Sequence, residues 1–164
     1  MFNRPYQFEI YQIEDHWWNS EIILPDESLL RLHIIRKEEH TNLLGIEGPQ
    51  YEFNFDRGPI DTPEPEKHKH VILNGMGDVF KIYSTVYDFC LHWALENRPR
   101  VLAWGAFSDS AYKVYRRLGS KYYKEWRYGI HPMKMFGAPI ENGRAVVMVK
   151  EDLVKDIVGE HEKF

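Results

Sequence analysis

The chain has 164 residues, of which 43% are hydrophobic and 28% charged, the composition of one globular domain with a sizeable core. Its single cysteine, Cys90, excludes an intramolecular disulfide and favours a reducing compartment. No apolar run approaches the ~20 residues of a membrane span, and the N-terminus lacks the pattern of a signal peptide, so we expect a soluble, intracellular protein that does not associate with membranes.

The first 56 residues predict antiparallel strands. Tyr6–Ile10 and Tyr51–Phe55 alternate apolar and polar residues, the pattern of a half-buried strand, and Glu21–Leu24 predicts a short strand between them. Ser28–Arg36 predicts a further strand. Its apolar face holds Leu30, Leu32 and Ile34, and its opposite, mixed face holds Arg31, His33 and Ile35. Turn residues separate these runs, which favours an antiparallel meander.

The middle of the chain predicts a loop, a short strand and a long helix. Residues 57–69 are rich in proline and charge and predict the loop, and His70–Leu73 predicts the strand. The helix runs from Asp78, a residue type common at N-caps, to Asn97. Apolar residues recur in it at steps of three and four, as on a helix packed against a sheet: Val79, Ile82, Tyr83, Val86, Phe89, Cys90 and Trp93.

The following segments complete a β-α-β pattern. Val101–Ala106 is an apolar run typical of a buried strand. A second helix then leads to Gly119, the residue type favoured just past a helix C-terminus. Three residues are candidates for the N-cap of this helix: Ser108, Asp109 and Ser110.

The last segments predict a hairpin and a tail. Trp126–Ile130 and Arg144–Val149 predict the two strands of the hairpin, with Asn142–Gly143 as the turn. Residues 150–164 form the tail, which holds a short amphipathic helix over Asp152–Val158. The whole chain, 1–164, is therefore expected to be a single α+β (mixed α/β) domain, a largely antiparallel twisted sheet with helices packed on it.

Two motifs in the second half point to a chemistry. Ala111, Tyr115 and Gly119 follow the spacing A-x-x-x-Y-x-x-x-G on the predicted helix, and Gly75-Met76-Gly77 lies between a predicted strand and a predicted helix. With these motifs in this order, residues 70–149 resemble the acyl-CoA-binding half of the GCN5-related N-acetyltransferases. The chain departs from that family at Ile72, where the family has Gln or Arg.

The resemblance implies a site for acetyl-CoA. Backbone N–H groups of a glycine-rich loop at a helix N-terminus bind phosphate well, so the loop would hold the CoA pyrophosphate. Asp78 places a negative charge beside this glycine-rich loop. At the start of the second helix, Ser108 stands where the family has Asn. The cofactor-binding residues implied are Leu73, Gly75, Met76, Gly77, Asp78, Ser108, Ala111, Arg116 and Arg117.

The resemblance also implies two catalytic roles. Tyr115 would protonate the leaving CoA thiolate, since a phenol is a hydrogen-bond donor at neutral pH. Glu52 would take the proton of the acceptor amine, with Asp56 and His70 as the other candidates for this base. Histidines His68 and His70 lack a carboxylate or thiolate at a metal-ligand spacing, so no metal is expected.

Two other functions remain open. The segments Val79–Phe80 and Tyr115–Leu118 also look like small acetyltransferase-like proteins of tailed bacteriophages, which implies a catalytically silent protein of the host cytoplasm or the virion that binds a host factor or other viral proteins. Residues 98–134 contain nine basic and two acidic residues in a chain of net charge −4, which predicts a local site for an anion or a nucleic acid.

Overall fold

The computed structural model describes residues 4–37, 45–59, 79–106, 108–117, 133–140, 143–158 and 162–163. The chain divides into two compact units, and each of them is discontinuous in sequence. Unit 1 comprises Met1–Ile34 and Asn54–Trp93, and unit 2 comprises Ile35–Phe53 and Ala94–Phe164.

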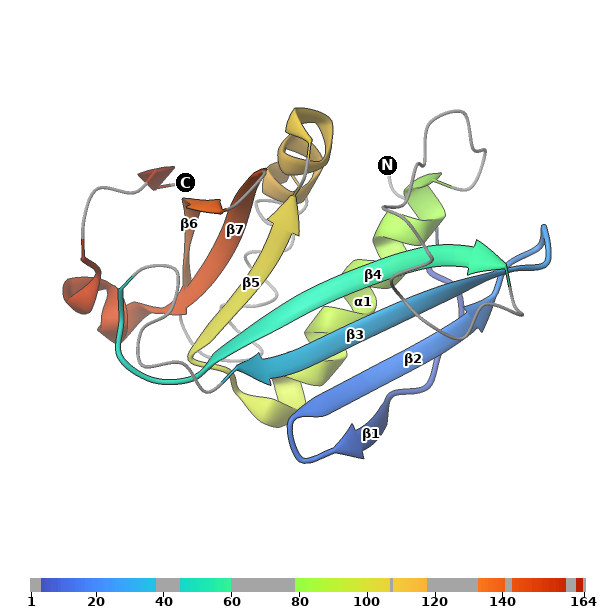
Figure 1. Ribbon diagram of the computed structural model, residues 1–164, viewed down its shortest axis with the longest axis horizontal. Helices are drawn as coiled ribbons and strands as arrows, with labels where there is room; N and C mark the ends of the chain where they lie inside the picture. Colours follow the sequence, from blue (N-terminus) through green and yellow to red (C-terminus); the bar gives the residue numbers. More distant parts are fainter. Residues whose placement is uncertain are drawn as a thin grey trace. The chain divides into compact units, whose positions relative to one another are not determined.

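The strands pair in the order β1-β2-β3-β4-β5-β7-β6-β8 (Figure 1). Their bounds are β1 (Tyr11–Glu14), β2 (Trp17–Ile23), β3 (Ser28–Lys37), β4 (Gln50–Pro59), β5 (Val101–Ala106), β6 (Met133–Ile140), β7 (Gly143–Lys150) and β8 (Glu162–Lys163). The pairs β1–β2, β5–β7, β6–β7 and β6–β8 are antiparallel, whereas β4–β5 is parallel. The fold is therefore α+β with a largely antiparallel sheet, as expected.

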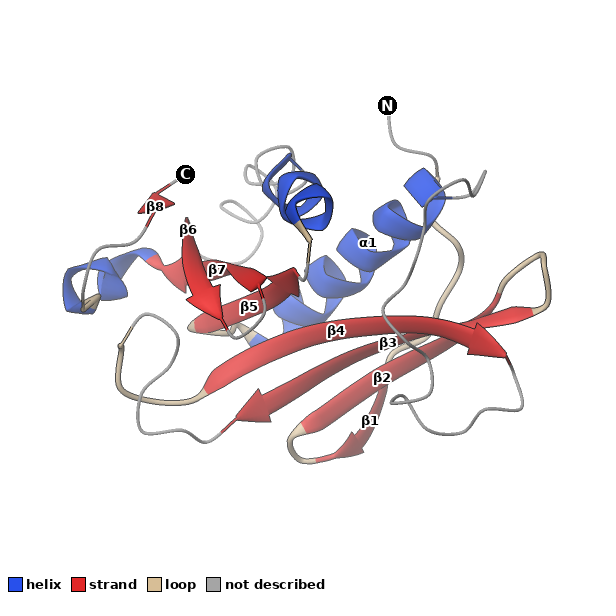
Figure 2. Cartoon of the chain, turned by 45° about the horizontal axis from the view of Figure 1, so that its top comes forward, coloured by secondary structure: helices blue, strands red, loops and turns tan. Residues whose placement is uncertain are grey.

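Unit 1 has its core between the helix α1 (Val79–Asn97) and one face of β2, β3 and β4 (Figure 2). The Trp93 ring meets the Trp18 ring edge-on at 5.4 Å between centroids, and Tyr83 meets Phe55 at 6.3 Å. The predicted stripes of β3 and, from Ile82 onward, of α1 are confirmed, because these side chains are fully buried: Leu30, Leu32, Ile34, Ile82, Val86, Phe89, Cys90 and Trp93.

The prediction of a strand over Tyr6–Ile10 is wrong. These residues pair with no strand in the described part of the chain, and the first strand is β1, which begins at Tyr11. The segment lies against α1 instead: the Tyr6 backbone N–H donates to Thr85 Oγ1 at 2.9 Å, and the Phe8 ring meets the Phe89 ring at 5.9 Å. Contact with a helix thus produces the alternation that sequence analysis assigned to a sheet.

Four other predicted boundaries are corrected. β2 begins at Trp17, before the expected start, and β4 extends to Pro59, so residues 57–59 are strand and not loop. The strand that forms a hairpin with β7 is β6, whereas the predicted strand at residues 126–130 lies outside the described residues. The tail helix is a 3-10 helix, η2 (Glu151–Asp156).

Unit 2 has its core on one face of β5, β7 and β6. Ile140, Leu153, Val154 and Ile157 pack against this core, so η2 and the residue after it cover part of that face. The buried cluster consists of Ile46, Val101, Ala103, Phe136, Ala138, Ala145, Val147 and Val149. A helical segment over residues 109–117 follows β5.

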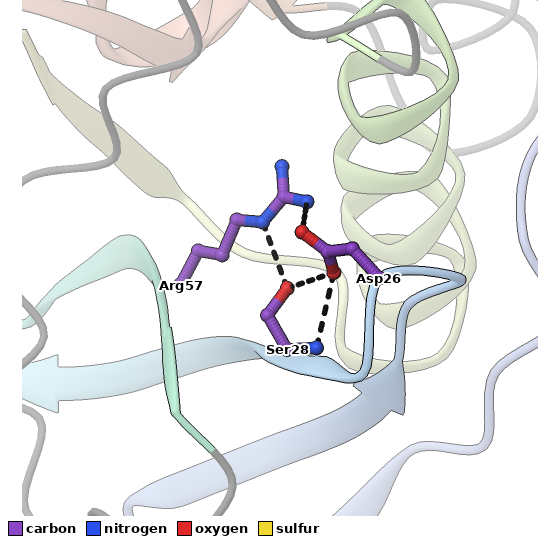
Figure 3. A network of polar contacts seen from close by, with 3 residues as sticks. All are labelled: Asp26, Ser28 and Arg57. Carbon is purple, nitrogen blue, oxygen red and sulfur yellow. Dashed lines mark hydrogen bonds and ion pairs between the residues drawn. The ribbon is translucent and has the colours of Figure 1, made fainter.

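A polar network explains why β4 extends beyond its predicted end (Figure 3). The Asp26 carboxylate accepts from the Ser28 backbone N–H at 3.0 Å and from the Ser28 hydroxyl. Arg57, on β4, donates from Nη2 to Asp26 Oδ2 at 2.7 Å and from Nε to Ser28 Oγ at 2.9 Å. Hydrogen bonds and an ion pair therefore link β4 to the turn between β2 and β3.

This network predicts a pH dependence of stability. The hydrogen bonds from Ser28, aided by the charge of Arg57, hold the pKa of the Asp26 carboxyl below its ordinary value of 3.8. Because the folded-state pKa is lowered, the stabilisation is present above the unfolded pKa and is lost as the pH falls through the folded pKa. Asp26→Asn should lower the free energy of unfolding by under about 1 kcal/mol at pH 7, since the carboxylate is half exposed.

Urea unfolding of the wild type and Asp26→Asn at pH 7, 5 and 3 measures this difference, which should shrink towards zero at the lowest pH. Asp15→Asn is the matched control, because Asp15 is an exposed carboxylate in the β1–β2 turn, at the other end of β2. A difference that stays constant from pH 7 to pH 3 would contradict the assignment of the lowered pKa to the folded state.

Candidate functional site

The candidate site of unit 2 lies where β5 ends and the helical segment 109–117 begins (Figure 1). The parallel pairing of β4 and β5 covers Tyr51↔Leu102, Glu52↔Ala103 and Phe53↔Trp104. Along its other edge β5 pairs with β7 as far as Ala106↔Arg144. The helical segment therefore starts from the carboxyl end of a strand that has a parallel neighbour, a common position for ligand sites in sheets of this kind.

Ser108 is the N-cap of the helical segment. Its Oγ accepts from the Ala111 backbone N–H at 3.1 Å, and its carbonyl oxygen accepts from the Tyr112 N–H at 3.0 Å. Of the three residues that the sequence proposed for this cap, the structure thus selects Ser108. Ala111 is half-buried and lies in the first turn of the helix, as the motif requires.

The helical segment has a buried side and a cationic side. Tyr112 and Tyr115 are buried, at 4% and 6% exposure. Lys113, Arg116 and Arg117 are exposed. The predicted acid Tyr115 therefore faces the protein, and the predicted phosphate ligands Arg116 and Arg117 face outward.

The predicted base Glu52 is already engaged. Its Oε2 lies 2.9 Å from Lys37 Nζ, and its Oε1 accepts from Gln50 Nε2 at 2.8 Å. Both carboxylate oxygens thus have a donor within hydrogen-bonding distance. Glu52 links the end of β3 to β4, and this environment does not suit a base.

The predicted pyrophosphate loop lies outside the described residues. This holds for Leu73, Gly75, Met76, Gly77 and Asp78, and also for the predicted strand His70–Leu73 and for Gly119.

Arg144 is a residue that the sequence reasoning missed at this site. It lies on β7, and its Cζ atom is 4.2 Å from the centre of the Tyr112 ring. The Cζ atom of Arg116 is 6.0 Å from the same centre. The two arginines come from segments far apart in the sequence, so only the pairing of β7 with β5 could have revealed that they share one ring.

Unit 1 holds a separate buried polar cluster on β2, β3 and β4. Trp17 Nε1 donates to His33 Nδ1 at 3.2 Å. His33 Nε2 faces Asp56 Oδ2 at 3.7 Å, and these side chains are only 9% and 11% exposed. On the same face Arg31 Nε lies 3.6 Å from Glu21 Oε1. The polar positions of β3, alternating with Leu30 and Leu32, were the sequence signal for this cluster.

The described residues hold no group of three or more His, Cys, Asp or Glu side chains that could bind a metal ion. No helix in this part of the chain is both long enough and apolar enough to cross a membrane. Comparison of the chain with protein-family models, with curated proteins and with solved structures finds no match.

Proposed function

We propose that the protein transfers an acyl group from acyl-CoA to an amine. The observation that carries this proposal is the run of elements β4, α1, β5 and helical segment 109–117, in which β4 and β5 are parallel within a largely antiparallel sheet. A helix, a strand and a capped helix follow one another as the resemblance to GCN5-related N-acetyltransferases implies. The buried Tyr115 on the last of these elements supports the proposal further.

In this reaction the acceptor nitrogen forms a bond to the thioester carbonyl carbon, and the carbon–sulfur bond breaks. The nitrogen loses its proton to solvent water, and the departing thiolate gains one from the Tyr115 hydroxyl, which then takes a proton back from solvent. The backbone around Gly75 and Gly77 is the proposed cradle of the pyrophosphate, because amide N–H groups at a helix N-terminus bind phosphate without a counter-charge. The pairing of Glu52 with Lys37 leads us not to assign the base to Glu52.

Acetyl-CoA should therefore raise the melting temperature. A ligand of the native state at 100 times its Kd stabilises a protein by about 2.7 kcal/mol, which is several degrees for a chain of this size. Gly77→Phe should abolish the shift without changing the melting temperature of the unliganded protein, and Gly77→Ala should lower the affinity less. Differential scanning fluorimetry with acetyl-CoA and with pantetheine as the phosphate-free control measures both effects.

An absence of any shift with millimolar acetyl-CoA would contradict the acyl-transfer proposal. It would favour the second proposal, a non-catalytic protein that binds a protein partner. An unchanged affinity in Gly77→Phe would contradict only the assignment of the pyrophosphate to the glycine loop.

A further inference from the structure

Two arginines of unit 2 converge on one buried aromatic ring. Tyr112 is 4% exposed, so packing fixes the position of its ring. Arg144 Cζ lies 4.2 Å from the ring centre and Arg116 Cζ lies 6.0 Å from it. Both arginines are exposed, and both contact the buried Tyr112 ring. This contact restricts the rotamers that their long side chains sample.

The two arginines are brought together by the fold. Arg116 follows Tyr112 by four residues, so both lie on one side of the helical segment. Arg144 is the second residue of β7 and pairs with Ala106 at the end of β5 and with Pro139 on β6. The site therefore consists of elements of unit 2 alone, and the pairing of β7 with β5 and β6 fixes the backbone of Arg144 in the sheet.

A guanidinium can contact an aromatic ring and an anion at the same time. A guanidinium that stacks on a ring presents its flat face to the ring, while its N–H groups point outward in the plane. Such a fork matches two oxygens of a phosphate, and a pre-positioned fork loses less entropy when it binds. Arg144 Cζ, 4.2 Å from the centre of the Tyr112 ring, is within the distance of a cation–π contact.

The charges around the ring favour an anion. Lys113 and Arg117 are exposed on the same helical segment, four residues apart, and like charges at this spacing repel. Asp109, four residues before Lys113, is the one carboxylate described on this segment. The positive charges therefore outnumber the negative ones, in a protein whose net charge is −4.

We propose that Arg144 and Arg116, held by the Tyr112 ring, form a phosphate-binding site. The ligand is a phosphoryl group that Arg144 binds through two N–H donors and Arg116 through its charge. The site does not depend on the proposed acyl transfer. A phosphorylated small molecule, acetyl-CoA or the backbone of a nucleic acid would each supply the group, and the test separates these sources.

Isothermal titration with inorganic pyrophosphate tests the site directly. The wild type should bind pyrophosphate, and Arg144→Gln should weaken binding at least tenfold. Arg144→Lys should weaken it about threefold or more, because it keeps the charge and loses the planar fork. Tyr112→Phe should bind as the wild type does, since it keeps the ring. Lys155→Gln, which removes an exposed cation on η2 of the same unit, is the matched control and should have no effect.

The same titration with acetyl-CoA and with a 20-nucleotide oligothymidylate identifies the source. A tenfold loss of acetyl-CoA affinity in Arg144→Gln would support the site as a contact for the acyl donor. A loss of oligonucleotide affinity, with a log–log salt slope reduced by about 0.7 for each lost phosphate contact, would support it as a nucleic-acid contact. A loss confined to pyrophosphate would support a small phosphorylated ligand that is distinct from the acyl donor.

Three results would overturn the proposal: no pyrophosphate binding by the wild type, equal binding by the wild type and Arg144→Gln, or binding of succinate as tight as that of pyrophosphate. Circular dichroism of each variant shows that it is folded. Pyrophosphate binding needs no acyl donor. The titration with pyrophosphate therefore tests the phosphate-binding site whether or not the protein binds acetyl-CoA.

Discussion

Replacing Trp93 with alanine is expected to lower the free energy of unfolding of unit 1 by about 3–5 kcal/mol, the range for removing a large aromatic side chain from a core. Trp93 is fully buried in α1, and its ring meets the Trp18 ring of β2 edge-on at 5.4 Å. The substitution removes the buried apolar area, leaves a cavity and ends this ring contact. Urea unfolding followed by far-ultraviolet circular dichroism measures the loss.

Glu96→Ala is the matched control for Trp93→Ala. Glu96 is exposed on the same helix, three residues further on, and its replacement should change the free energy of unfolding by at most about 0.5 kcal/mol. If Trp93→Ala cost less than about 1 kcal/mol, α1 would not be packed on β2 as described. The core of unit 1 would then have to be placed elsewhere.

The elements that the sequence predicted correctly are those with a strong period and a buried face. α1 and β3 were found because their apolar stripes match the periods of a helix and a strand, and β5 was found as a short apolar run. The pattern failed at Tyr6–Ile10, where Phe8 packs on α1 and not on a sheet. Periodicity reports that one side is buried, but it does not report which element buries it.

The candidate site was less predictable, because contacts between distant residues decide its chemistry. Glu52 was a reasonable base as an isolated carboxylate on a central strand. Its engagement by Lys37 depends on the position of the end of β3 beside β4, which no local pattern encodes. Likewise, Arg144 and Tyr112 are 32 positions apart, and only the register of β7 on β5 brings the arginine to the ring. The N-cap Ser108 could be predicted because capping is local.

The cluster of the half-buried Trp17 with the buried His33 and Asp56 shows the same limit in unit 1. The sequence placed Arg31 and His33 on one face of a strand, and the structure confirms that face. What the sequence lacked was the partner on each side: the indole of Trp17 from β2 and the carboxylate of Asp56 from β4. Buried polar groups cost stability unless partners satisfy them, so such residues on an otherwise apolar strand predict cross-strand partners without identifying them.

Tyr115→Phe is expected to lower the turnover of the proposed acyl transfer by roughly 10²-fold, the scale for the loss of a general acid. The substitution removes only the hydroxyl, which is the proposed proton donor to the thiolate, and keeps the ring that is buried in the helical segment. The affinity for acetyl-CoA should barely change, because the hydroxyl acts on the leaving group and not on the phosphates. Release of free thiol, followed with a chromogenic disulfide reagent, and titration calorimetry measure the two quantities.

Tyr112→Phe is the matched control, since Tyr112 lies on the same helical segment and is buried to a similar degree. It removes an equivalent hydroxyl three residues away and should leave turnover unchanged. A proton donor also predicts that the defect shrinks with acyl donors whose thiol is more acidic, because a better leaving group needs less protonation. Turnover of Tyr115→Phe equal to that of the wild type, or a defect that is the same for all leaving groups, would show that Tyr115 is a packing residue.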